Sequence, residues 1–223
     1  MLIFLFFINS LVFSYLDISD KKICSYNPIE ISFYPLNNYK VDFRLVRPSV
    51  QDRTIQLCIP AAFTSQDNKP EGLIFLNGVN KYKYRSTNGS GALFISLGEC
   101  EILSIEAAND LAQNPKNNFF SLFQQYQLIR NGRSYENPFS KRKLQMRVIA
   151  FLNKKIFIIE SKNQVESEKF ITHLLDIGVT EALYLDMGSW SEGWYRSEND
   201  VIVKIGLNRQ NTHRQTNWLL FHR

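Results

Sequence analysis

The sequence predicts an α+β fold built on a mixed, largely antiparallel twisted sheet with a few packed helices. Three observations support this prediction. Short segments of alternating apolar and polar residues fill the first half of the chain, two-residue turns join several segments, and one amphipathic helix lies between strands in the second half. This order packs helices on a sheet around one continuous core.

The first strands are expected near the N-terminus. Residues 30–34, 40–46 and 54–59 alternate apolar and polar side chains, which is typical of strands with one buried face. The third segment stops at Pro60, which cannot donate a hydrogen bond to a neighbouring strand. Residues 61–70 contain Ser, Gln, Asn, Lys and Pro and are predicted to form a loop.

Two-residue turns predict three hairpins. Asn-Gly readily adopts the positive φ angles that such turns require, and it occurs twice between apolar segments. An Asn-Lys pair separates the apolar residues 145–152 from residues 155–160 in the same way. The three turns are expected at residues 77–78, 131–132 and 153–154.

The middle of the chain predicts both strands and helical turns. Residues 92–97 and 100–105 read as a strand and its return strand, separated by a glycine turn. Residues 105–111 and 119–126 lie on either side of Pro115, and we expect a short helical segment in each.

The second half contains the clearest helix. Residues 165–176 place apolar side chains at helical spacing, and Gly178 follows where a glycine commonly ends a helix. A buried strand is then expected at residues 182–185, and two closing strands at 201–205 and 217–221. His173, on the polar side of the helix, is expected to be solvated.

Length and charge restrict the class of protein. The chain has 223 residues, enough for one domain with a sizeable core or two small domains, and its net charge of +5 is modest. Basic residues form short clusters, including residues 141–143, but no nucleic-acid-binding motif accompanies them. We therefore expect no nucleic-acid partner. No linker divides residues 55–223, and residues 15–54 supply the first strands of the same domain.

Residues 1–14 are almost entirely apolar. They are too few to span a bilayer, which takes about 20 residues, and they predict a cleaved secretory signal peptide. The chain would then be secreted or periplasmic, with no membrane span after cleavage. An uncleaved anchor or a buried first strand are the alternatives.

The cysteines indicate no metal site. Cys24, Cys58 and Cys100 allow one disulfide and one free thiol, or three free thiols. Their spacing matches no zinc motif, so we assign no metal ligands, and the sequence identifies no cofactor.

Asp186 is the main candidate for chemistry. It ends the apolar segment 182–185, and a turn of small and aromatic residues follows. A carboxylate at the end of a buried strand is rigidly held, which suits acid–base catalysis or ligand binding. An Asp at this point also commonly caps its own turn, here residues 187–190.

Four segments together resemble the phosphodiester glycosidase domain family. Residues 72–78, 127–132, 147–151 and 182–189 occur in the order and spacing of that family, and the resemblance covers about residues 55–221. It implies an exported, bacterial-type protein that hydrolyses a bond between a sugar and a phosphodiester, with a glycan or sugar phosphate as its ligand.

The match at the strand end is partial. The family usually has Leu-Asp-Gly-Gly followed by Ser; here Asp186, Gly188 and Ser189 match, while Met187 replaces the first glycine. The family's Asn-Gly-Gly-Phe-Phe should fall near residues 59–64, where only Phe63 is retained. These departures favour an alternative function, a non-catalytic glycan or cell-envelope binding module. A structural protein that docks on a partner is a third possibility.

The resemblance implies roles for further residues. Arg147 would act with Asp186 in catalysis by gripping a phosphate, although an ordinary ion-paired arginine is the alternative. Aromatic rings after the acid would stack on a sugar, or would form a hydrophobic lid over the sheet edge. The expected ligand-binding residues are Ser189, Trp190, Trp194 and Tyr195, with Arg130 and Asn131 from an inner loop.

Overall fold

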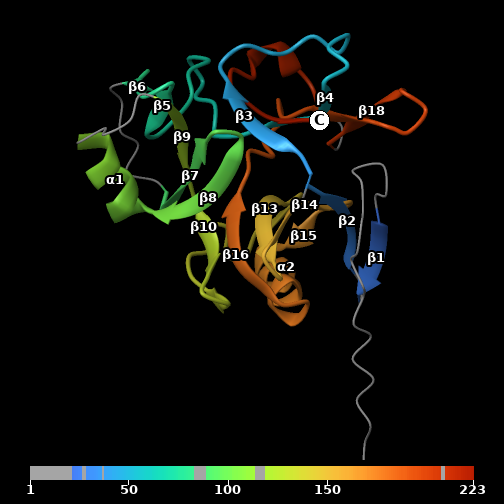
Figure 1. The fold of residues 1–223 in the computed structure, drawn as a ribbon. Coiled ribbons are helices and arrows are strands. Elements are labelled where there is room, and N and C mark those ends of the chain that lie inside the picture. Colours follow the sequence, from blue (N-terminus) through green and yellow to red (C-terminus); the bar gives the residue numbers. More distant parts are fainter. Residues whose placement is uncertain (1–21, 27–28, 37, 83–88, 114–118, 207–208) are drawn as a thin grey trace, which may run out of the picture.

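The computed structural model describes residues 22–223 apart from 27–28, 37, 83–88, 114–118 and 207–208 (Figure 1). The predicted signal peptide, residues 1–14, lies outside these residues. The described strands form four sheets, and every strand pair is antiparallel. The fold is therefore α+β but mostly β, and the mixed sheet that we predicted is replaced by antiparallel sheets. The chain forms a single domain.

The largest sheet has seven strands, and α2 (Ser167–Asp176) packs on one of its faces. Its strands, in spatial order, are β1 (Lys22–Tyr26), β2 (Ile29–Pro35), β14 (Lys155–Ser161), β13 (Arg147–Leu152), β16 (Val179–Tyr184), β10 (Gln127–Arg130) and β11 (Arg133–Ser134). Central β13 is buried on both faces, as are the last three residues of β16, which holds that end of β16 rigidly.

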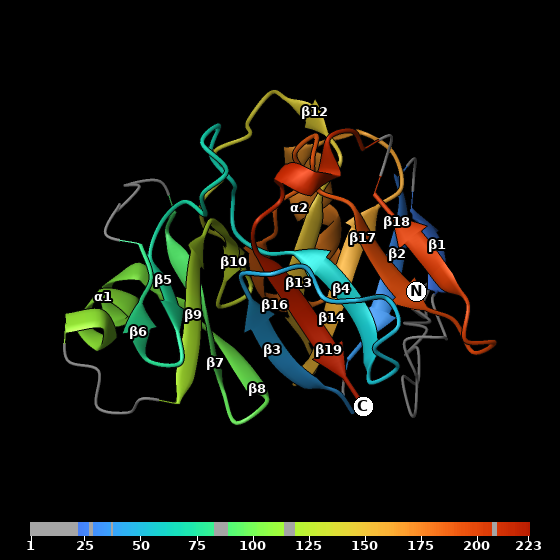
Figure 2. The same cartoon turned by 90° about the horizontal axis from the view of Figure 1, so that it is seen from above.

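The other sheets are smaller (Figure 2). One consists of β18 (Ile202–Ile205), β17 (Gly193–Arg196), β4 (Ile55–Pro60), β19 (Trp218–His222) and β3 (Lys40–Arg44). Another consists of β6 (Val79–Asn80), β5 (Ile74–Leu76), β9 (Phe120–Gln125), β7 (Gly91–Ser96) and β8 (Glu99–Ser104), with α1 (Ile105–Gln113) packed against β7 and β8. The last pairs β12 (Lys143–Leu144) with β15 (Val165–Glu166), and a 3-10 helix, η2, covers Thr212–Arg214.

The three larger sheets meet in one apolar core. Ile149 and Leu183 come from the seven-stranded sheet, Leu57 and Phe221 from the sheet of β4, and Phe123 from the sheet of β9. A second cluster fills the space between the seven-stranded sheet and α2. The N-terminal strands β2, β3 and β4 belong to the same sheets as the later strands, so the chain folds as one unit.

The predicted hairpins are confirmed. β5–β6, β10–β11 and β13–β14 are antiparallel pairs joined at residues 77–78, 131–132 and 153–154, where both turn residues have positive φ. The helix at residues 165–176 is confirmed from Ser167, and Gly178 adopts a φ of 91° after it. The short helix near residues 105–111 is also confirmed, as α1.

The helix predicted at residues 119–126 is wrong. These residues form β9, which pairs with β5 on one side and β7 on the other. Phe123 faces the main core while Phe120 and Leu122 face α1, so the segment places apolar side chains on both faces of a sheet. Tertiary packing has overridden a weak local preference.

Two further findings concern the membrane and the cysteines. Among the described residues, neither helix has the length and apolarity that crossing a bilayer requires. Cys58 is buried and Cys100 half-buried, and both are free thiols. Burial raises the pKa of each thiol to about 12, so both are poor nucleophiles at neutral pH.

Candidate functional site

Asp186 lies directly beyond the end of β16, against the loop that follows β4. Its backbone N–H donates to the carbonyl oxygen of Ala61 at 2.9 Å. The next residue of this loop, Ala62, is held by the buried Asn217 side chain. The Asn217 amide oxygen accepts from the Ala62 N–H at 2.6 Å, and the Asn217 amide NH2 donates to the Ala62 carbonyl oxygen at 3.0 Å. The segment expected to replace the family's Asn-Gly-Gly motif is therefore held beside Asp186.

A pocket of about 620 Å³ opens beside this acid, and we call it the Asp186 pocket. Its walls contain four aromatic rings, two cationic side chains and one carboxyl group. The lining residues are Phe63, Thr64, Phe139, Arg142, Lys143, Leu144, Tyr184, Asp186, Met187, Gly188, Ser189 and Trp190. They come from distant parts of the chain, and a concave site with few polar groups is typical of ligand pockets.

One wall of the Asp186 pocket is a packed aromatic cluster. The Tyr184 ring centroid lies 4.6 Å from that of Phe139 and 5.7 Å from that of Phe63. Tyr126 supports both phenylalanines from outside the pocket, at 5.7 and 6.0 Å between centroids. Phe63, the residue that matches the phosphodiester glycosidase motif in sequence, therefore lines the pocket.

Asp186 itself is 5% exposed and sits at the pocket wall. Its Oδ1 accepts a hydrogen bond of 2.8 Å from the Gly188 N–H, so it caps its own turn as well as lining the pocket. Burial raises its pKa above the usual 3.8, against the opposing influence of the Gly188 N–H, the Ser191 hydroxyl and Arg147. A buried carboxyl with a raised pKa in a pocket is a candidate proton donor.

Arg147 is fully buried and does not line the pocket. Its Nε and Nη2 donate to the same Glu160 oxygen at 2.9 and 2.7 Å, across the β13–β14 pair. Glu160 also accepts from Gln145 at 3.0 Å. The structure thus favours the ion-paired alternative for Arg147, although this arginine is close enough to lower the pKa of Asp186.

Arg209 is a charged residue that contacts Met187 of the pocket wall, and the sequence did not identify it. Its Nη2 donates to the Gln145 side-chain oxygen at 2.7 Å and lies 3.8 Å from the Met187 sulfur. Burial and the nearby Arg147 lower its pKa, while Glu160 and Asp186 oppose that change. No local pattern could have identified Arg209, because all of its partners come from other elements.

Ser189 and Trp190 line the pocket as predicted sugar-binding residues would. Ser189 is exposed, and its carbonyl oxygen accepts from the Gln210 N–H at 3.0 Å. The Arg214 guanidinium lies 3.9 Å from the centre of the half-buried Trp190 ring, and Arg214 in turn donates to the Asn68 side chain at 2.8 Å. This stacking fixes the orientation of Trp190 at the pocket.

Trp194 and Tyr195 lie elsewhere. Trp194 is 1% exposed and packs in a core cluster with Cys58 and Trp218, so neither ring face is open to a sugar. Tyr195 points to the opposite side of β17 and packs against Tyr34, with 5.5 Å between ring centroids. Neither residue lines the Asp186 pocket.

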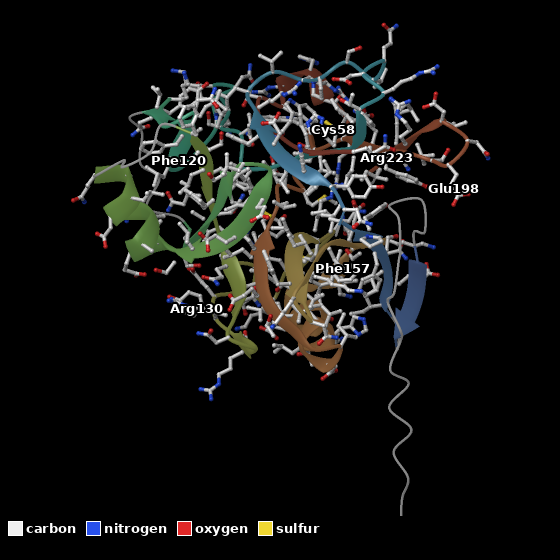
Figure 3. The ribbon with its side chains drawn as sticks, in the orientation of Figure 1. Cys58, Phe120, Arg130, Phe157, Glu198 and Arg223 are labelled. Atoms are coloured by element: carbon white, nitrogen blue, oxygen red, sulfur yellow. The ribbon has the colours of Figure 1, made fainter. Side chains whose placement is uncertain are left out.

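Arg130 and Asn131 occupy the other end of β16. The Asn131 N–H donates to Glu181 at 2.8 Å, and Arg130 stacks on Tyr135 at 5.2 Å. Glu181 and Asp186 are five residues apart, or roughly 15 Å along an extended chain. Figure 3 shows Arg130 at the lower end of β10, below the sheet that carries Cys58.

The titratable groups do not assemble a metal site. Within the ranges that the structure describes, no three His, Cys, Asp or Glu side chains come together. His173, predicted to be solvated, is only 3% exposed. That prediction is wrong because α2 contacts β10, β11 and β16, so more of the helix is covered than its apolar stripe indicates.

Comparison with known proteins supports the fold. No family model matches the chain, and no curated protein sequence matches it. The catalytic domain of zebrafish N-acetylglucosamine-1-phosphodiester alpha-N-acetylglucosaminidase, auto-inhibited by its pro-peptide, has a similar structure: the TM-score is 0.64 at 12% identity, over 91% of this chain and 81% of that chain. A hypothetical protein from Synechocystis gives a TM-score of 0.56 at 12% identity, over 91% of this chain and 61% of that one.

Proposed function

We propose that the Asp186 pocket binds the sugar–phosphodiester part of a glycan and that the protein hydrolyses the bond between the sugar and the phosphate. The observation that carries the proposal is the composition of the pocket: one buried acid lies in the same cavity as two cations and an aromatic wall. The similarity of the fold to a phosphodiester glycosidase domain supports the same substrate class. The apolar N-terminal segment supports export to a compartment where glycans occur.

Each part of the substrate has a matching surface. Arg142 and Lys143 are exposed cations that attract the phosphate. Trp190 offers the sugar a ring that Arg214 holds in place. Arg147, bound to Glu160, does not grip the phosphate and instead contributes positive charge near Asp186.

Asp186 would transfer the proton. Hydrolysis breaks the bond between the sugar's anomeric carbon and a phosphate oxygen, and water supplies the new oxygen on that carbon. Asp186 gives its proton to the departing phosphate oxygen and regains one from the attacking water, so the acid is restored. Its raised pKa favours the protonated form that this step requires.

A second candidate function is binding without catalysis. Asp186 is the one carboxyl among the lining residues that the structure describes, whereas glycoside hydrolysis usually employs two carboxyl groups. In addition, the Gly188 N–H already occupies Oδ1 of Asp186. These observations favour a glycan-binding module that retains the pocket and lacks the reaction.

The test uses a methyl diester of N-acetylglucosamine 1-phosphate as substrate. Purified wild type is expected to release the free sugar, and Asp186→Asn is expected to lose at least about 100-fold in rate, the usual contribution of a general acid. Asp176→Asn, on the exposed end of α2 and outside the pocket, serves as the matched control and should retain the wild-type rate.

Binding measurements with two further variants distinguish the two candidates. If wild type and Asp186→Asn release sugar at one background rate, hydrolysis by this site is refuted. Saturable binding of the diester that weakens in Trp190→Ala and in Arg142→Ala, without product, would then establish the binding module. Absence of both binding and product would refute both candidates.

A further inference from the structure

A second pocket, of about 500 Å³, lies at the far end of β13 from the Asp186 pocket. Residues 142–144 border the Asp186 pocket before β13, and residues 154–156 border the second pocket after it. The six residues of β13 span about 20 Å, so the two pockets are separate sites. They share no lining residue.

Three segments form this second site, which we call the hairpin pocket. The turns of the β7–β8 and β13–β14 hairpins meet the chain that enters β3. The Val41 N–H donates to the Gly98 carbonyl oxygen at 2.7 Å, and the Leu36 N–H donates to the Ile156 carbonyl oxygen at 2.9 Å. Backbone hydrogen bonds therefore tie both hairpins to this connection, and the pocket is a built feature of the fold.

Each of the two hairpin turns at this pocket contains a residue type that is unusual at positive φ, whereas the other two turns are Asn-Gly. Four two-residue hairpin turns lie within the described residues, at 77–78, 97–98, 131–132 and 153–154, and each has positive φ at both positions. Two of them are Asn-Gly, the pair that adopts this geometry most readily. The others contain Leu97, at a φ of 54°, and Lys154, at a φ of 62°.

Leu97 and Lys154 are poor choices for their backbone geometry. Asn would suit the first position and Gly the second, since a larger side chain crowds the backbone at positive φ. Leu97 is also 90% exposed, so burial of its side chain does not compensate for the strain. Both exceptional residues line the hairpin pocket, whereas the Asn-Gly turns do not. Strained residues that gather at one pocket indicate a function for their side chains.

The lining of the hairpin pocket is cationic with an apolar rim. Lys40, Lys154 and Lys155 supply three positive charges against the single carboxylate of Glu99. Lysine ammonium groups attract phosphate as point charges. The exposed Leu97 side chain adds an apolar contact beside them.

We propose that the hairpin pocket is a second ligand site, which binds a phosphate group attached to an apolar moiety. The lysines hold the phosphate and Leu97 contacts the apolar part. This phosphate can belong to a phospholipid headgroup or to a soluble phosphate ester, and the experiment distinguishes the two. The site is independent of hydrolysis at Asp186, so Asp186→Asn leaves its affinity unchanged.

The test changes each exceptional residue to the one its turn prefers. Lys154→Gly and Leu97→Asn relieve the backbone, so both variants should fold with a melting temperature equal to wild type or higher. Binding is measured to phosphatidylcholine vesicles with and without phosphatidylglycerol, by co-sedimentation, and to hexyl phosphate, by calorimetry. Lys154→Gly should weaken binding of the anionic probes about fivefold, the usual effect of one lysine near an anionic surface.

Lys141→Gly is the matched control. Lys141 is exposed, has a φ of 64° and lines neither pocket, so the substitution makes the same change of charge and backbone elsewhere. It should retain wild-type affinity. Vesicle binding that Lys154→Gly and Leu97→Asn both weaken, without binding of hexyl phosphate in solution, identifies a phospholipid as the source of the phosphate.

Binding of hexyl phosphate without vesicle binding, weakened by Lys154→Gly, identifies a soluble ester instead. The proposal is overturned if wild type binds none of the anionic probes, or if Lys154→Gly and Lys141→Gly behave alike. Vesicle binding that is unchanged in both Lys154→Gly and Leu97→Asn would also overturn the proposal, because the membrane contact would then lie elsewhere on the molecule.

Discussion

The turn after β16 and the strand β17 that follows it are similar in composition but differ in structure: one lines a pocket and the other is packed within a sheet. Residues 186–190 end in Trp190, and β17 carries Trp194; both segments combine a glycine, a charged residue and a tryptophan. The first segment lines the Asp186 pocket, while the second lies between β4 and β18 in a sheet. Sequence distance from the acid is therefore a poor guide to membership of the site.

Strand pairing explains the difference. Trp194 is opposite Cys58 of β4, so its side chain enters the cluster on that face of the sheet. Gly193 beside it allows the strands to approach, because a Cβ there would lie 2.9 Å from the Cys58 carbonyl oxygen. Trp190 precedes this pairing and remains half-buried at the pocket.

The largest expected effect is the difference in stability between two tryptophan variants. Trp194→Ala empties a buried site and should lower the free energy of unfolding by about 3–5 kcal/mol. Trp190→Ala should lower it by less than about 1 kcal/mol and should instead weaken glycan binding. Urea unfolding of both variants measures the contrast, and equal losses of stability would contradict the separate roles.

A similar contrast divides the two charged residues that sequence reasoning placed together. Arg147 is a buried partner of Glu160, and Asp186 is an acid at a pocket wall. Arg147→Ala leaves the Glu160 carboxylate buried without its cation, which should cost about 3 kcal/mol or more.

Its control replaces both partners. Arg147→Met combined with Glu160→Leu removes the two charges together, and it should recover most of the lost stability because no buried charge is left unpaired. The free energies of unfolding of the single and double variants provide the measurement. If the double variant is as unstable as Arg147→Ala, the unpaired charge of Glu160 is not the cause of the lost stability.

The sequence predicted what is local in the chain. The β13–β14 hairpin, α2 and its terminal Gly178 depend on turn residues and apolar spacing within a few positions, and all three are present. The secondary structure of residues 119–126 was mispredicted because it depends on pairing with β5 and β7, which lie far away in sequence. Local patterns cannot report such pairing.

The site was only partly predictable for the same reason. Asp186, Ser189 and Trp190 belong to one continuous turn, and that turn lines the pocket. Another part of the wall comes from Phe63, Phe139 and residues 142–144, which no spacing rule connects to the turn. The basic cluster at 141–143 was visible in the sequence, but only the tertiary fold shows that Arg142 and Lys143 line the pocket.

The smallest expected effect tests how Asp186 is held. Its pKa is raised in the folded protein, so the folded state binds this proton more tightly than the unfolded state does. The resulting stability is present below about pH 3.8 and is lost as the pH rises through the raised pKa. Asp186→Asn removes the charge and should therefore become more stable relative to wild type as the pH increases.

Asp42→Asn gives the matched control with the opposite sign. Burial would raise the pKa of Asp42, but the nearby His222 ring and the hydrogen bond of 2.8 Å from Arg44 lower it, so its carboxylate stabilises the folded state at neutral pH. Asp42→Asn should accordingly lose stability relative to wild type as the pH rises. Melting temperatures of the three proteins from acidic to neutral pH make the comparison. If Asp186→Asn follows wild type at every pH, the turn pairs the carboxylate well enough to cancel its burial, which would favour capping over proton transfer.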